Sequence, residues 1–171
     1  WITLARGREL LRMAGQDFDR VKAMAATKAF RPVPLGVRAS MTIHNTLRRV
    51  DSSNVVAKIE GRDPVLRREL VVYTAHWDHL GIGPAVDGDS IYNGAKDNAV
   101  GTAGLLEIAR AFTELPARPR RSVLFLAVTA EEQGLLGSQY YTVTPIHPLV
   151  RTVAIINMDG LNVHGRTRDL T

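Results

Sequence analysis

The sequence predicts a three-layer α/β/α sandwich with a mixed, largely parallel central sheet. Three continuous apolar runs have the length of strands, and segments with the apolar spacing of helices lie between them. A strand covered on both faces is apolar at nearly every position, whereas a half-buried strand alternates. Such strands alternating with helices are typical of a sheet with helices on both faces. The three runs are residues 69–75, 122–129 and 153–158.

The N-terminal part of the chain predicts helices and a connector rather than sheet. Residues 3–30 carry apolar side chains at helical spacing, and Gly15 is placed to end a first helix. Asp17 is a plausible N-cap for a second helix. The proline-containing segment 31–36 is typical of a connector. We therefore expect a helical segment with its connector at 1–36 and an α/β domain at 37–171.

The α/β domain begins with two further predicted strands. Apolar and polar residues alternate at 37–44, as in a half-buried strand, and 54–59 predicts the next strand. A Gly-Arg-Asp-Pro turn at 61–64 precedes the first fully apolar run. Helices are expected at 97–112 and 131–141, and a solvated turn at 87–89.

Composition excludes several classes of site. The chain has 171 residues, no cysteine and a formal net charge of +5. The lack of cysteine excludes a disulfide, a thiolate metal site and a cysteine nucleophile. No apolar run approaches the roughly 20 residues of a membrane span. Basic clusters without interleaved aromatic residues predict a solvated surface rather than a nucleic-acid site. These clusters are Arg48-Arg49, Arg67-Arg68 and residues 118–121.

Side chains that can bind metal follow each of the three apolar runs. Sites in open α/β sheets form outside the carboxyl ends of the strands, so these side chains should share one rim of the sheet. A further carboxylate, Asp97, lies in a loop directly before the first predicted helix of the domain. The residues after the runs are His76 and Asp78, then Glu131 and Glu132, and last Asp159.

Carboxylates gathered at one rim need a cation. They would repel one another and raise one another's pKa values, and a bound cation removes that repulsion. One imidazole, that of His76, with several carboxylates suits Zn²⁺, with Mn²⁺ or Co²⁺ as alternatives. So many anionic ligands suit two ions better than one. The sequence therefore predicts a two-metal hydrolytic site.

The ordered set of motifs resembles the M28 family of di-zinc peptidases, most of which are aminopeptidases. An HxD motif, a GxxDN loop, an EE pair after a buried strand and an NMDG strand end follow one another over roughly residues 37–165. Jointly and in this order the motifs are specific, whereas each one alone is weak. The matching segments are His76-Trp77-Asp78, residues 93–98, residues 129–134 and Asn157-Met158-Asp159-Gly160.

The resemblance implies a role for each matched residue. It also implies a cis peptide bond after Asp97. The implied first-zinc ligands are His76 and Asp159, the bridging ligand is Asp97, the second-zinc ligand is Glu132, the general base is Glu131, and the partner that orients His76 is Asp78.

The family has one more ligand, a histidine well downstream of the NMDG segment. His164 lies too close to Asp159 to fill that role. The second zinc would then keep only Asp97 and Glu132, so we expect weak binding there and a fragment that is inactive by itself. For His79, a packing role or an indirect role behind the ligands is favoured. The start at Trp1, without methionine or a signal-like segment, also suggests a fragment of a longer protein.

The resemblance implies a zinc-dependent exopeptidase with a peptide substrate and two Zn²⁺ ions per full-length catalytic domain. An aminopeptidase is favoured over a carboxypeptidase, with a metal-activated water and Glu131 as base. Export to the periplasm or the outside of the cell is expected from the family. One alternative is a related metal amidase or cyclase on the same scaffold. Another is a non-catalytic binding module, and the presence of Glu131 argues against this second alternative.

Overall fold

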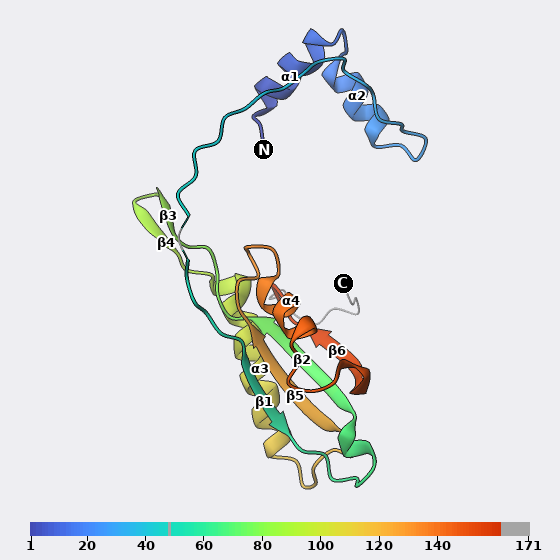
Figure 1. The fold of residues 1–171 in the computed structure, drawn as a ribbon, viewed down its shortest axis with the longest axis vertical. Coiled ribbons are helices and arrows are strands. Elements are labelled where there is room, and N and C mark those ends of the chain that lie inside the picture. Colours follow the sequence, from blue (N-terminus) through green and yellow to red (C-terminus); the bar gives the residue numbers. More distant parts are fainter. Residues whose placement is uncertain (48, 162–171) are drawn as a thin grey trace. The chain divides into compact units, whose positions relative to one another are not determined.

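The computed structural model describes residues 1–47 and 49–161, which belong to two compact units (Figure 1). One unit is Trp1–Arg48 and the other is Arg49–Thr171. His164 therefore lies outside the described residues, as does Arg48 of the first basic cluster.

The first unit contains the two helices that its sequence predicts. Helix α1 spans Leu4–Met13 and α2 spans Phe18–Ala25. The Asp17 carboxylate accepts a hydrogen bond from the Arg20 N–H at 2.7 Å and so caps α2, as expected for an N-cap aspartate. Gly15 follows α1 with φ of +67°, the left-handed conformation that ends many helices.

The prediction of a strand at 37–44 is wrong. These residues form no regular secondary structure, and Met41 and Ile43 are 79% and 66% exposed. An alternating pattern becomes a strand only where a neighbouring strand pairs its backbone and an apolar layer covers one face. Among the described residues neither is provided to this segment.

The second unit is built on a four-stranded mixed sheet whose strand order is β1-β5-β2-β6. Strand β2 is parallel to both β5 and β6, and β1 is antiparallel to β5. This confirms the mixed, largely parallel sheet, and it brings the carboxyl ends of β2, β5 and β6 to one rim. The bounds are Val55–Ile59 for β1, Leu70–His76 for β2, Ser122–Val128 for β5 and Thr152–Asn157 for β6.

Two apolar layers, one on each face of the sheet, confirm the three-layer sandwich. Alternate residues of β2 and β5 pack on Tyr141 of α4, which spans Leu136–Val143. The intervening residues pack on Leu105 of α3, which spans Val100–Thr113. Leu124, in the middle of β5, is fully buried. Helices α3 and α4 therefore cover opposite faces of the sheet (Figure 1).

The third apolar run forms the strand that it predicts, but this strand is not buried on both faces as predicted. Strand β6 pairs with β2 on one side only, and within the described residues it is the edge of the sheet. Val153, Ile155 and Ile156 are 51%, 65% and 42% exposed. An apolar run shows that a strand can be covered on both faces; burial still requires neighbours on those faces.

The two helices of the domain begin later than the sequence predicts. Backbone angles at Asp97 are not helical, so α3 starts at Val100. Ala130 and Leu135 have positive φ of 53° and 63°, so Glu131 and its successors form a turn before α4. A left-handed residue cannot continue a right-handed helix, which explains the shift.

A hairpin that the apolar pattern does not reveal follows the first apolar run. Strand β3 spans Gly81–Val86 and β4 spans Asp89–Tyr92, and they form a separate two-stranded sheet. The solvated turn expected at 87–89 is the tip of this hairpin.

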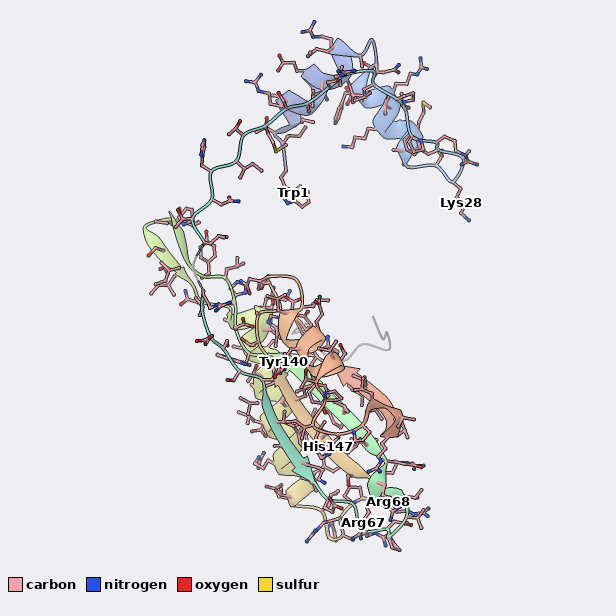
Figure 2. The ribbon with its side chains drawn as sticks, in the orientation of Figure 1. Trp1, Lys28, Arg67, Arg68, Tyr140 and His147 are labelled. Carbon is pink, nitrogen blue, oxygen red and sulfur yellow. The ribbon has the colours of Figure 1, made fainter. Side chains whose placement is uncertain are left out.

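The basic clusters are partly neutralised. Arg120 pairs with Asp63 at 3.0 Å and Arg121 pairs with Glu69. Arg67 and Arg68 lie at the amino end of β2 (Figure 2). In the described part of the chain no helix has both the length and the apolar character needed to cross a bilayer.

Candidate metal centre

His76 is the last residue of the central strand β2, and its imidazole is buried at 3% exposure. The Thr102 hydroxyl of α3 donates to the His76 carbonyl at 3.1 Å, which ties this strand end to the helix. The imidazole Nδ1–H donates to the Asp78 carbonyl at 3.0 Å. A backbone oxygen can only accept, so in the neutral imidazole this contact fixes the tautomer and leaves the Nε2 lone pair free for a ligand.

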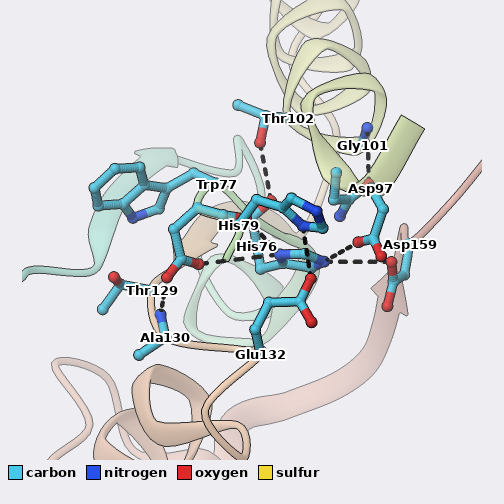
Figure 3. A network of polar contacts seen from close by, with 12 residues as sticks. His76, Trp77, His79, Asp97, Gly101, Thr102, Thr129, Ala130, Glu132 and Asp159 are labelled. Atoms are coloured by element: carbon cyan, nitrogen blue, oxygen red, sulfur yellow. Dashed lines mark hydrogen bonds and ion pairs between the residues drawn. The ribbon is translucent and has the colours of Figure 1, made fainter. Parts of the chain in front are cut away.

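Two carboxylates meet that Nε2 atom (Figure 3). It lies 3.0 Å from an Asp97 oxygen and 3.3 Å from an Asp159 oxygen. Asp97 precedes α3, and its peptide bond to Asn98 is cis, as the resemblance implies. Asp159 follows β6, where the Met158 N–H extends the ladder by donating to the Thr74 carbonyl at 2.8 Å.

Buried Asn98 joins the two loops that carry these carboxylates. Its side-chain NH₂ donates to the Met158 carbonyl at 2.9 Å. Its side-chain oxygen accepts from the Gly101 N–H at 3.1 Å and the Gly160 N–H at 3.3 Å. Asn98 is 1% exposed, so these bonds have little competition from water. The structure thus gives Asn98 a positioning role that no sequence pattern indicates.

The Asp78 carboxylate is directed to the next strand end. One oxygen accepts from the Ala130 N–H at 2.6 Å, and the other lies 4.0 Å from His76 Nδ1. Asp78 therefore contacts His76 through its carbonyl and fixes the start of the Glu131-Glu132 turn through its side chain.

Glu131 and Glu132 occupy different parts of the centre. Glu131 lines a cavity of about 240 Å³ together with His76 and Asp159. Glu132 instead lies against His79, with its Oε1 atom 2.7 Å from His79 Nδ1 (Figure 3). The sequence pattern favours a packing or indirect role for His79, whereas the structure places it against Glu132.

The ligand-type atoms form two groups that share one residue. Within each group the atoms lie within 4.8 Å of one another, and Asp97 belongs to both. A shared carboxylate is the arrangement expected for a bridge between two cations. The groups are His76, Asp97 and Asp159, here called the strand group, and His79, Asp97 and Glu132, here called the loop group.

The charges of the protein shift two pKa values in the centre. Burial lowers the pKa of His76, but the Asp78 carbonyl and the Asp159 carboxylate favour the imidazolium, and the pKa is raised overall. Burial raises the pKa of Glu131; His76 opposes this, and neighbouring carboxylates, Glu132 foremost, add to the rise. A carboxyl pKa displaced toward neutrality suits a group that takes and returns protons near pH 7.

The residues fit zinc. Two ligands of a tetrahedral Zn²⁺ with bonds of about 2.0–2.1 Å stand roughly 3.3–3.4 Å apart, close to the separations of His76 Nε2 from its two carboxylates. In the loop group, His79 Nδ1 and Glu132 Oε1 are 2.7 Å apart, which is an ion-pair distance and shorter than this separation. One imidazole and two carboxylates per position are ligands that zinc accepts.

A family comparison agrees with this geometry. Residues 54–171, well over half of the chain, match the model of peptidase family M28. The chain belongs to family M28. The matched span includes the ends of β2, β5 and β6 and the loop before α3.

Relatives of this M28 chain are aminopeptidases and zinc metalloproteases. It is 39% identical over 131 residues to the aminopeptidase NAALADL1 of Mus musculus, covering 74% of this chain and 16% of the relative. It is 36% identical over 107 residues to a probable zinc metalloprotease of Leptosphaeria maculans, covering 63% of this chain and 24% of the relative. The chain thus spans less than a quarter of the length of either protein.

The fold is also found among solved structures. LapA of Legionella pneumophila superposes with a TM-score of 0.50 and 25% identity, over 63% of this chain and 27% of that one. The match supports the mixed sheet with flanking helices as the part of an M28 domain that this chain supplies.

Proposed function

We propose that this protein is a zinc-dependent exopeptidase, and specifically an aminopeptidase, acting on peptide substrates. The observation that carries the proposal is the convergence of the strand group and the loop group on Asp97 at one rim of the sheet. Residues up to 83 positions apart in the sequence meet there, as His76 and Asp159 do.

Residues of this chain would supply the zinc ligands in this proposal. The strand group would hold one Zn²⁺, and Asp97 and Glu132 would contribute to the second. Bound zinc supplies Lewis acidity, which polarises a carbonyl and lowers the pKa of water. The Asp78 carbonyl fixes the His76 tautomer that would bind the cation through Nε2, and Asn98 keeps the two carboxylate loops together.

Glu131 would move the protons. In peptide hydrolysis a water oxygen bonds to the scissile carbonyl carbon, and the bond from that carbon to the leaving nitrogen breaks. The Glu131 carboxylate takes a proton from the water and gives it to the leaving amine. Its place in the cavity beside His76 and its raised pKa support this role.

Aminopeptidase specificity is supported by the mouse relative, which bears that name. Export from the cytoplasm and a further histidine ligand downstream are also proposed, on the family resemblance alone. Cell fractionation tests the first, and the sequence of the complete gene product tests the second.

Hydrolysis of an aminoacyl anilide with a free α-amine, compared with the same anilide acetylated at that amine, tests the proposal. In the complete gene product the free substrate should be cleaved and the blocked one should not. Glu131→Gln should lower kcat by about 10²–10⁴-fold while zinc content stays unchanged. Glu107→Gln, an exposed α3 residue paired with Arg110, is the matched control and should leave the rate unaltered.

A Glu131→Gln variant with full activity would remove Glu131 from the mechanism. Cleavage of the blocked anilide at an equal rate would exclude an aminopeptidase, and a protein that binds no zinc would exclude the metallopeptidase.

A further inference from the structure

We propose that Asn54, assisted by Ser52, is a positioning residue for Glu131 and Glu132. It holds the segment that carries both glutamates, residues 129–137, here called the glutamate turn. This inference rests on the proposed function, since Glu131 is the base and Glu132 a zinc ligand of that site. Neither Asn54 nor Ser52 needs to touch zinc or substrate in this role.

The glutamate turn has a backbone that must be held by its surroundings. Ala130 and Leu135 have positive φ of 53° and 63°, although neither is a glycine. Such conformations are unfavourable and persist only where the surrounding structure fixes them. Inside the turn, the N–H groups of Gly134 and Leu135 both donate to the Glu131 carbonyl at 2.9 Å. The position of Glu131 therefore depends on the turn as a whole.

Asn54 joins the two ends of this turn. Its side-chain oxygen accepts from the Thr129 N–H at 3.1 Å, and its side-chain NH₂ donates to the Gly137 carbonyl at 2.7 Å. The Gly137 N–H donates to the Thr129 carbonyl at 2.9 Å, so the three residues close a ring of hydrogen bonds. Thr129 and Gly137 are buried, which limits competition from water. The ring needs both the acceptor and the donor of an asparagine side chain.

The absence of a side chain at Gly137 allows this ring to close. A Cβ built on Gly137 would overlap the Thr129 carbonyl oxygen and the Asn54 side-chain oxygen. The residue after β5, the first turn of α4 and residue 54 therefore approach at a distance that only glycine permits. This close approach fixes where α4 begins relative to the end of β5.

Two further contacts connect the segment 52–54 to the metal centre. The Ser52 and Thr129 hydroxyl groups share a hydrogen bond at 2.6 Å. Trp77, in the HxD motif, donates from Nε1 to the Ser53 carbonyl at 3.2 Å. The segment before β1 thus contacts both the HxD motif and the start of the glutamate turn.

Calorimetric zinc titration of the complete gene product provides the first test. Glu132→Ala and His76→Ala identify the two zinc-binding events, each by the event that it weakens. In Asn54→Ala the event that depends on Glu132 should weaken about 10–100-fold, as with other residues that orient metal ligands. The event that depends on His76 should be retained, since His76 lies on β2 outside the glutamate turn.

Kinetics at saturating zinc provide the second test. The kcat of Asn54→Ala for the aminoacyl anilide should fall about 100-fold, the loss expected when a catalytic group is displaced by about 1 Å. KM should stay unchanged, because Glu131 moves protons in the transition state. The zinc-binding event that depends on His76 counts the folded molecules, so kcat is expressed per folded protein.

Two further variants separate positioning from stability. Asp63→Asn removes the acceptor of two backbone N–H groups at the turn before β2. It should lower the Tm and leave both zinc events and kcat unaltered, as a purely structural residue would. Ser52→Ala removes one hydroxyl contact at an exposed residue. It should lower kcat and weaken the event that depends on Glu132, both by smaller factors than Asn54→Ala.

The outcomes are distinct. A folded Asn54→Ala with unchanged kcat and zinc binding would overturn the inference and leave the proposed function intact. Equal weakening of both zinc events would also overturn it. If Asn54→Ala fails to fold, Ser52→Ala decides, and unchanged kcat and zinc binding in that variant would overturn the inference. An unaltered gene product that cleaves neither anilide would overturn the proposed function itself.

Discussion

The strand group and the loop group share Asp97 but are built in different ways. His76 ends the central strand β2, is buried, and is held at its carbonyl by Thr102 and at Nδ1 by Asp78. His79 and Glu132 lie in irregular segments beyond strand ends, as Asp159 also does, so the groups differ in the element that carries the histidine. About a fifth of the His79 and Glu132 side chains is exposed, compared with 54% of Asp97 and 44% of Asp159.

The difference in the elements that carry the two histidines indicates which ligands are held rigidly. Ligands on strands and helices are held more closely to one geometry than ligands on loops. We therefore expect the strand group to bind zinc more tightly, and the loop group to respond more to changes in the loops around it. The first three substitutions below test this contrast, and the fourth lies far from both groups.

Removing the histidine of the strand group should have the largest effect. Orienting partners of metal ligands are typically worth 10–100-fold in affinity, so loss of the ligand itself should exceed about 100-fold. His76→Ala should abolish the tighter zinc-binding event in calorimetry and the hydrolytic activity with it. The account fails at this point if the variant keeps the tighter event.

Removing the amide that joins the carboxylate loops should have the next largest effect. Asn98→Ala leaves the Met158 carbonyl and the Gly101 and Gly160 N–H groups without their partner. An unsatisfied buried group costs about 1–3 kcal/mol, so urea denaturation should show a loss of at least that size. Asn98→Asp keeps the acceptor but sets a second acceptor against the Met158 carbonyl in a buried place, so at pH 7 it should be at least as destabilised as Asn98→Ala. Wild-type stability in Asn98→Ala would contradict the positioning role.

A bulkier residue at Gly94 should affect the loop group selectively. The added methyl group of Gly94→Ala would overlap His79 and the Asp97 carbonyl, at a cost of about 1–3 kcal/mol, and the weaker zinc event should suffer more than the tighter one. Gly88→Ala is the control, since Gly88 also has positive φ but open space around it. Equal weakening of both zinc events would mean that the two groups are not distinct.

The smallest effect is expected far from both groups, at the turn before β2. Backbone N–H groups of Leu66 and Val65, then Arg120, lower the pKa of Asp63 to about 2. The ionised form is favoured by folding, so its stabilising effect is present above the ordinary pKa of about 3.9 and is lost as pH falls toward 2. Asp63→Asn should lower the Tm at pH 7, converge with the unaltered chain in acid, and leave zinc binding unchanged. A pH-independent Tm difference would contradict this assignment.

The buried part of the fold could be predicted from the sequence because continuous apolar runs have one common cause. Strands β2 and β5 are apolar since helices cover both faces, and their order fixes the rim where His76 and Glu131 lie. The alternating pattern at 37–44 did not give a strand, and the apolar run of β6 did not give burial, because both depend on which neighbours a segment finds. No local pattern states that.

The site was predictable to the extent that its residues follow strands. His76, Glu132 and Asp159 each stand near a strand end, and Asp97 was found through its motif. His79 and Asn98 gave no such signal, because His79 depends on a close approach at Gly94 and Asn98 on contacts across two loops. Both are matters of tertiary packing.

Anomalous diffraction at the zinc edge, from crystals of the zinc-loaded chain, tests the central claim most directly. The account predicts two peaks about 3.5–4 Å apart, one beside His76 and Asp159, the other beside His79 and Glu132, with Asp97 between them. Zinc bound elsewhere, with no peak at this rim, would contradict it.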